Sequence, residues 1–233
     1  ITNEGEEWTI KQEEVKLSPS INSILVARVD RLSVLVKSTV KAAAVIGREF
    51  EVPILSEVMH NQAEFQNVGN YQVLLNEQIA KAEENQIWRA MSEMKYLFKH
   101  SLLREAVYDM QLRSRLKEIH LAIGEAIEKL FPERLEERYE DLAFHFEKAE
   151  DKSRTIHYLH KAANKSRQKY QNQQAIDFYD KLLQYLDDPE NIVNKVNILL
   201  KKANIQELIG QWDSSKLDTN RGWKSDCFVY FFF

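Results

Sequence analysis

Residues Leu97 to Asp109, LFKHSLLREAVYD, contain the transition that decides the fold. The first residues are apolar or aromatic, as in a short strand, and the second half carries apolar residues at helical spacing. The polar pair Lys99 and His100 separates the two halves, so a strand is predicted to lead directly into a helix. On that helix, His100 and Arg104 are expected together on the flank of the buried face.

A β-hairpin is predicted around the strand of this stretch. The segments Ile87 to Arg89 and Tyr96 to Phe98 flank a polar connection, which is the pattern of two paired strands. Amphipathic helices precede the hairpin, at Ile21 to Leu32, Val36 to Ala44 and Tyr71 to Glu84. Compact helices, a hairpin and a further helix in direct succession are the order expected of a winged-helix domain, with the hairpin as its wing.

The sequence after Pro132 contains a weak internal repeat. EKAEDKSRTIHYLHKAA can be aligned with QKYQNQQAIDFYDKLL so that small, aromatic and apolar positions recur in the same order. The aligned pairs are Thr155 with Ala175, Leu159 with Tyr179, and Ala162 with Leu182. Helices are expected near residues 139–149, 152–168, 172–186 and 191–209, packed antiparallel as hairpins. The pattern predicts a short tetratricopeptide-like array.

The last residues follow no such pattern. TNRGWKSDCFVYFFF, at residues 219–233, carries 6 aromatic residues with neither a helical nor an alternating period. We therefore expect residues 213–233 to form a divergent or truncated tail that is foreign to the helical array.

The composition limits the classes of protein to which the chain can belong. Only 6 Gly and 4 Pro leave few turn residues for a sheet protein, so a mainly α fold is predicted. A formal net charge of -4 gives no electrostatic reason to expect nucleic acid or an anionic membrane as a partner. The single cysteine, Cys227, cannot form an internal disulfide, which favours a reducing, cytoplasmic location. The longest apolar runs are far shorter than the roughly 20 residues needed to cross a bilayer.

Four stretches together resemble one family. They are LSPSINSILVARVDRL (17–32), AAAVIGREF (42–50), LFKHSLLREAVYDMQLRSRLKEIH (97–120) and LAFHFEKAEDKSRTIHYLHKAA (142–163). In this order they resemble the region carboxy-terminal to the P-loop ATPase core of bacterial signal-transduction ATPases with numerous domains, especially those fused to adenylate or guanylate cyclase domains. The resemblance covers roughly residues 8–212. The chain lacks the family's cyclase domain and its phosphate-binding loop, GxxxxGK followed by Ser or Thr.

The resemblance implies a domain order and a place in a larger protein. Residues 1–20 would be the end of the preceding ATPase domain or a linker, residues 21–131 a winged-helix-like regulatory domain with its small β-hairpin, residues 132–212 antiparallel tetratricopeptide-like helical hairpins, and residues 213–233 the divergent tail. The chain begins at Ile1 rather than Met, so we expect an internal piece of a longer protein. ATP or ADP would be bound by the parent protein, and no cofactor is expected in this fragment.

His100 and Arg104 are the candidate nucleotide-sensing residues. In related nucleotide-switch ATPases, a His in the pattern Met-His-Asp-Leu contacts the phosphates of ADP and holds the off state. FKHSLLRE resembles that pattern at His100 and Leu102. It departs from it at Lys99, where the family has Met, and at Ser101, where the family has Asp. An imidazole at a helix start can donate to a phosphate oxygen, and the alternative is that His100 caps the wing and Arg104 is a solvated surface residue.

Arg28 and Arg31, in ARVDRL, are candidate contacts to the adjacent ATPase domain. The alternative is a polar helix face, where ion pairs contribute roughly 0 to 1 kcal/mol. Neither a catalytic nor a metal site is predicted. His157 and His160 could meet on one flank of a helix, but no third ligand has matching spacing.

Three functions remain open after these steps. The leading hypothesis is a non-catalytic regulatory fragment of a multidomain signalling ATPase, with a nucleotide-dependent switch, a cyclase-type output in the parent protein, and helical repeats that bind a protein partner. The alternatives are a free-standing helical-repeat scaffold for protein interaction and a part of an ATPase-type transcriptional regulator. DNA binding by the chain itself is disfavoured, because the helix from Tyr71 to Glu84 is acidic.

Overall fold

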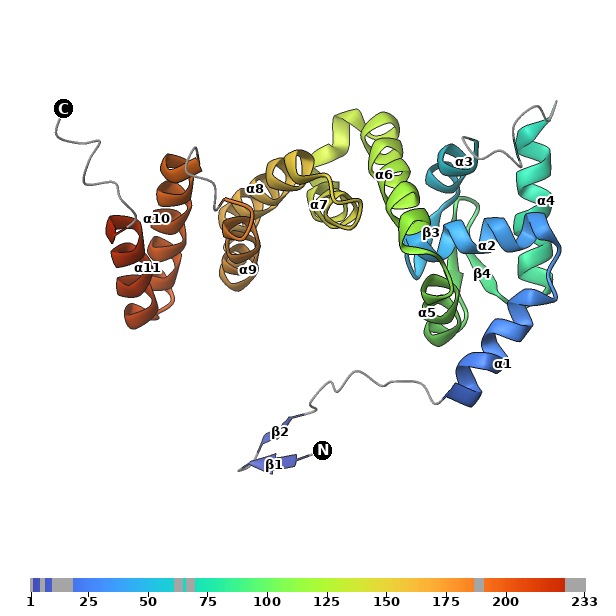
Figure 1. The fold of residues 1–233 in the computed structure, drawn as a ribbon, viewed down its shortest axis with the longest axis horizontal. Coiled ribbons are helices and arrows are strands. Elements are labelled where there is room, and N and C mark those ends of the chain that lie inside the picture. The colour runs from blue at the N-terminus through green and yellow to red at the C-terminus, as the bar shows by residue number, and fades with distance from the viewer. Residues whose placement is uncertain are drawn as a thin grey trace. The chain divides into compact units, whose positions relative to one another are not determined.

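A computed structural model of the 233-residue chain describes residues 2–4, 7–9, 19–60, 65, 70–186 and 191–224. The described residues are mainly helical, which confirms the predicted fold class at that level (Figure 1). The chain divides into two compact units, the first comprising Ile1–Val52 and Gln62–Leu112 and the second comprising Pro53–Asn61 and Arg113–Phe233.

The first unit combines helices with small antiparallel sheets. Its helices are α1 (Pro19–Asp30), α2 (Val34–Ile46), α4 (Tyr71–Glu84) and α5 (Ser101–Asp109). Its strands are β1 (Thr2–Glu4), β2 (Glu7–Thr9), β3 (Glu49–Glu51), β4 (Trp88–Ser92) and β5 (Lys95–Phe98). Strand β1 pairs with β2, and the other sheet has the order β3-β5-β4. Helix α5 is the next element after β5, so the predicted change from strand to helix is confirmed.

Aromatic residues join the three-stranded sheet to its helices. Phe50, Trp88 and Phe98 are buried. The ring centroid of Trp88 lies 5.0 Å from that of Phe50 and 5.6 Å from that of Phe98. The indole Nε1 of Trp88 donates a hydrogen bond to the carbonyl oxygen of Ile79 on α4, at 3.1 Å. A polar contact within the aromatic cluster therefore fixes β4 against α4.

The hairpin of β4 and β5 confirms the predicted pair of strands, with Trp88 opposite Phe98. The sequence does not predict β3, which pairs with the other side of β5. This strand has only 3 residues and one buried side chain, Phe50, so it is too short for an alternating pattern to reveal it. The assignment of the unit as a winged helix stays a prediction.

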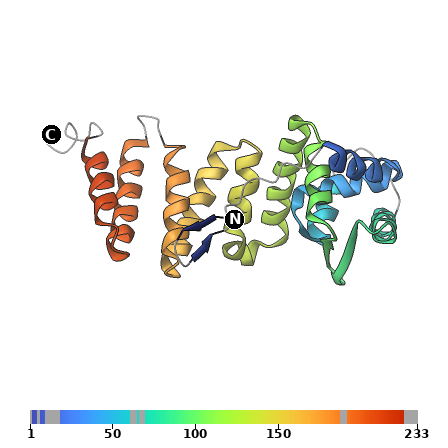
Figure 2. The same cartoon turned by 90° about the horizontal axis from the view of Figure 1, so that it is seen from below.

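The second unit is helical. Its elements are α3 (Val52–His60), α6 (Arg113–Leu130), the 3-10 helix η2 (Pro132–Arg138), α7 (Tyr139–Lys148), α8 (Lys152–Gln168), α9 (Asn172–Leu183), α10 (Ile192–Leu208) and α11 (Trp212–Lys224). From α6 onward, each of these α-helices packs on the next, and Figure 2 shows them side by side as successive hairpins. The four helices predicted after Pro132 are confirmed to within a few residues at their ends, and their assignment as tetratricopeptide-like stays a prediction. Among the helices described, none is long and apolar enough to cross a membrane.

The division into compact units falls between Leu112 and Arg113, so α6 belongs to the second unit, and the predicted domain boundary between residues 131 and 132 stays a prediction. A glycine allows this close packing. A Cβ atom built on Gly124 would lie 2.6 Å from ring atoms of Phe146 on α7, so only a residue without a side chain fits there. The periodicity of α6 shows that one face is buried, but it carries no information on which neighbour covers that face.

Helix α11 contradicts the expectation that the tail from residue 213 lacks regular structure. Residues 212–224 are helical and pack on α10, while residues 225–233 lie outside the described part of the chain. The buried side chains described on α11 include Ser215 and Asp218. Asp218 is paired with Lys202 at 2.8 Å, and Ser215 donates to a carboxylate oxygen of Glu207 at 2.9 Å. A search for apolar periodicity misses such a helix because the buried positions described on it are polar.

Candidate functional site

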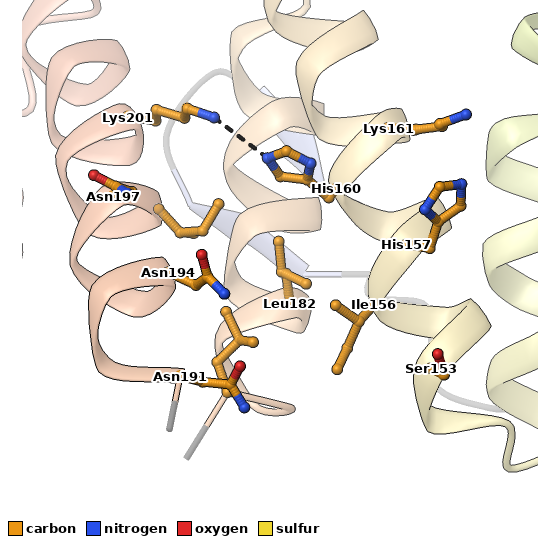
Figure 3. A pocket seen from close by; sticks show the side chains of 12 residues that line it. Ser153, Ile156, His157, His160, Lys161, Leu182, Asn191, Asn194, Asn197 and Lys201 are labelled. Atoms are coloured by element: carbon orange, nitrogen blue, oxygen red, sulfur yellow. Dashed lines mark hydrogen bonds between the residues drawn. The ribbon is translucent and has the colours of Figure 1, made fainter. Parts of the chain in front are cut away.

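A pocket lies among the helical hairpins of the second unit. It is formed by α8, the end of α9 and α10, and its volume is about 590 Å³ (Figure 3). Pockets that bind ligands commonly enclose roughly 300–1,000 Å³. The pocket therefore has the size of a binding site.

Two rows of polar side chains border the pocket, one from α8 and one from α10 (Figure 3). The α8 row consists of Ser153, His157, His160 and Lys161. The α10 row consists of Asn194, Asn197 and Lys201. Within each row the residues recur at helical spacing, so they share one face of their helix. The two rows supply hydrogen-bond donors from two sides.

Aliphatic side chains form an apolar floor between the rows. They are Ile156, Leu182, Leu186 and Ile198. The last three of these are buried, which fixes the floor as part of the packing between the helices. The pocket thus combines an apolar surface with polar groups at its edges, which is the usual composition of a ligand site.

His160 connects the two rows. Its Nε2 lies 3.3 Å from Nζ of Lys201 and 3.3 Å from Nδ2 of Asn164. Both neighbours are donors, so Nε2 accepts and the neutral ring carries its proton on Nδ1. Burial lowers the pKa of His160, and the charges of Lys201 and then His157 lower it further. The ring is thus a neutral acceptor for Lys201 near pH 7.

The charged side chains in the described lining of the pocket are all of one sign. Its charged lining residues, Lys161 and Lys201, are basic. Burial lowers the pKa of Lys201, and the positive charge of Arg167 lowers it further. None of the ion pairs between described residues includes Lys161, Arg167 or Lys201. The pocket therefore carries positive charge that no described carboxylate neutralises.

The nucleotide-sensing candidates, His100 and Arg104, lie at the start of α5. His100 is exposed and precedes the helix, and its carbonyl oxygen accepts the backbone N–H of Arg104 at 3.3 Å. The guanidinium of Arg104 donates to the carbonyl oxygen of Ala44 on α2, at 3.3 Å, and lies 5.8 Å from the ring centroid of Tyr108. Arg104 is thus engaged within the first unit, and a joint role with His100 in nucleotide sensing stays a prediction.

The interdomain candidates differ from each other in their surroundings. Arg28 donates through one nitrogen to the carbonyl oxygens of Asn85 and Gln86, each at 3.0 Å. These carbonyls directly follow the end of α4 at Glu84, so Arg28 has a structural role in this unit. Arg31 is exposed. A contact of either arginine with an ATPase domain stays a prediction.

The sequence gives no signal for a buried histidine pair, His120 on α6 and His145 on α7. Their Nδ1 atoms lie 2.9 Å apart, and the rings are 0% and 4% exposed. Burial and the charge of Lys148 lower the pKa of His120 from 6.5 to about 4. Burial and the neighbouring His120 lower the pKa of His145 from 6.5 to about 3. The two rings therefore form a neutral pair in which one Nδ1–H donates to the other Nδ1.

The pocket offers ammonium, amide and imidazole donors, and its described lining contains no carboxylate. In the described part of the chain, no three side chains of His, Cys, Asp or Glu are grouped as ligands for a metal ion. Comparisons of the chain with protein-family models, curated proteins and solved structures find no match.

Proposed function

We propose that this chain is a non-catalytic regulatory part of a multidomain signalling ATPase, and that its second unit binds a protein partner in the pocket between α8 and α10. The pocket is the observation that carries the proposal. It combines an apolar floor with two rows of donors and has a volume of about 590 Å³. The signalling context, the adjacent ATPase domain, the cyclase-type output and the cytoplasmic location rest on the sequence alone.

The shape of the pocket favours a polypeptide over a compact metabolite. The α8 row extends from Ser153 to Lys161, which corresponds to roughly 12 Å along a helix. Extended polypeptide rises about 3.3 Å per residue, so about four residues of a bound segment would pass along the row.

Peptide display on the full 233-residue chain tests the binding function. Asn197→Trp places a large ring in the pocket, and Asn204→Trp makes the same change at an exposed position of α10 outside the lining. The wild-type chain and Asn204→Trp should enrich the same peptides from a random library, and Asn197→Trp should lose them. Equal enrichment by all three proteins, or enrichment by none, would contradict the proposal.

A second element of the proposal is the nucleotide switch in the first unit. His100 is exposed at the start of α5, where an ADP phosphate held by the adjacent ATPase domain could meet it. ADP contacts through His100 would favour a closed arrangement, because a ligand shifts an equilibrium only through its differential affinity for the two states. His100→Ala in the full-length parent protein should raise basal output. Unchanged output together with unchanged ADP affinity would remove this role and leave the free-standing scaffold as the better hypothesis.

A further inference from the structure

We infer that the pocket between α8 and α10 binds an acidic segment of extended polypeptide, whose carboxylates contact Lys161 and Lys201 and whose aliphatic side chain packs on the apolar floor. This inference rests on the proposed protein-binding function and names the chemistry of the partner. It concerns the second unit only and is independent of the nucleotide switch.

The first argument is charge complementarity. Lys161 on α8 and Lys201 on α10 are the charged residues of the described lining. In Figure 3 the ammonium group of Lys201 points towards His160, whereas that of Lys161 points away from the α10 row, so Lys161 would have to change its side-chain conformation to reach a bound carboxylate. Lys161 lies with its Nζ 5.1 Å from the ring centroid of Tyr139, and Lys201 has a neutral imidazole as its hydrogen-bond partner. Neither interaction neutralises an ammonium group. Arg167 adds to the positive field, since its charge lowers the pKa of Lys201.

The second argument is the placement of neutral donors beside the lysines. Asn194 and Asn197 precede Lys201 on the same face of α10. Their amide groups can donate to carboxylate oxygens or to backbone carbonyls of a peptide. The lysines supply the charge, and the amides can hold the backbone. Such a row binds a chain along its length rather than a single anion.

The third argument separates a peptide from a nucleic acid. The apolar floor is aliphatic, and among the described lining residues none is aromatic. Single-stranded nucleic acids are usually held by base stacking on aromatic side chains, in addition to positive charge. The floor instead fits a Leu, Ile or Val side chain.

The histidines of the α8 row add a dependence on pH. Burial lowers the pKa of His157, the charge of Lys161 lowers it further, and the charge of Glu128 on α6 raises it. Burial also lowers the pKa of His160, and the charges of Lys201 and then His157 lower it further. A bound carboxylate favours the protonated imidazoles, so binding takes up protons. Affinity should therefore rise as pH falls from 8 to 6, a range in which peptide carboxylates, with pKa values of about 4, stay ionised.

Fluorescence anisotropy with the full chain provides the test. The probe is a short labelled peptide made of Glu and Leu, and its comparison probes are a Gln and Leu peptide of the same length and a single-stranded RNA of uridines. The acidic peptide should bind, with an affinity that falls as salt rises. Lys161→Gln and Lys201→Gln should each weaken it about fivefold. Lys216→Gln, at an exposed position of α11, removes the same charge outside the pocket and should leave the affinity unchanged.

The outcomes separate this inference from the function on which it rests. Equal affinity for the Gln and Leu peptide, or tighter pocket-dependent binding of the RNA, would overturn the acidic partner. If peptide display enriches uncharged sequences that Asn197→Trp abolishes, the protein-binding function stands and only this inference fails. If display enriches nothing, both fail. Should Lys201→Gln not fold, as judged by circular dichroism, Lys161→Gln and the dependence on pH and salt still decide the result.

Discussion

Acidification from pH 8 to pH 5 should destabilise the second unit through the buried pair of His120 and His145. The folded-state pKa values, about 4 and about 3, lie below the ordinary value of 6.5. Unfolded imidazoles bind protons as pH falls below 6.5, whereas the folded pair stays neutral until the lower values are reached. The contribution of the neutral pair to the free energy of unfolding is therefore fully present above pH 6.5 and is lost as pH falls below that value.

The magnitude follows from the pKa values and from the contact between the rings. At pH 5, each unfolded imidazole is protonated and each folded one is mostly neutral. One pKa unit corresponds to 1.36 kcal/mol, so 1.5 units below 6.5 gives about 2 kcal/mol for each ring and about 4 kcal/mol for both. Protonation of both rings would also place two N–H groups against each other across the 2.9 Å contact. A loss of this size is a large fraction of the roughly 5–15 kcal/mol that stabilises a typical domain.

Urea denaturation at a series of pH values measures this loss. The double variant His120→Gln/His145→Gln replaces both rings by neutral amides. Between pH 8 and pH 5 its free energy of unfolding should fall by about 4 kcal/mol less than that of the wild-type chain. His157→Gln removes an exposed ring and should retain most of the wild-type loss. If the wild-type chain loses less than about 1 kcal/mol, or if the double variant loses as much as the wild type, the reasoning from burial is wrong.

Two further predictions concern helix packing and can be measured by the same denaturation experiment. Gly124→Ala should destabilise the chain by about 1–3 kcal/mol, because its Cβ would meet Phe146, and unchanged stability would mean that α6 and α7 can separate without cost. Lys202→Met should destabilise the chain by about 1.5–3 kcal/mol, because it removes the ammonium group that is paired with the carboxylate of Asp218, whose side chain is 5% exposed. The added change Asp218→Asn should recover part of that loss, and no recovery would argue against the ion pair as the cause.

The sequence predicts those helices and strands whose formation depends on residues close to them along the chain. The helices after Pro132 and the hairpin that ends at Phe98 have regular apolar spacing, so their types and approximate limits follow from pattern alone. The strand at Phe50 does not, because its place in the sheet depends on a partner that is distant in sequence. Helix α11 does not follow from pattern either, because the buried positions described on it, Ser215 and Asp218, are polar.

The candidate site could not be predicted for a related reason. Lys161 and Lys201 line one pocket only because α8 and α10 both pack on α9, and nothing in the sequence near either residue indicates the other. The same holds for His120 and His145. They lie on different helices, and nothing in the spacing of the sequence indicates that their rings meet. His100 and Arg104 show the opposite case: their place at the start of one helix is predicted, but the hydrogen bond of Arg104 to Ala44 depends on how α2 and α5 pack.

The polar contact between α10 and α11 has a consequence for the order in which the second unit opens. The ammonium group of Lys202 lies 2.6 Å from a carboxylate oxygen of Asp180 and 2.8 Å from one of Asp218, so a single cation ties three successive helices. Sliding α11 by one residue would carry Asp218 off this cation, which makes the contact specific for one alignment. We expect α11 to fray first as ionic strength rises, ahead of the aliphatic packing that surrounds the pocket.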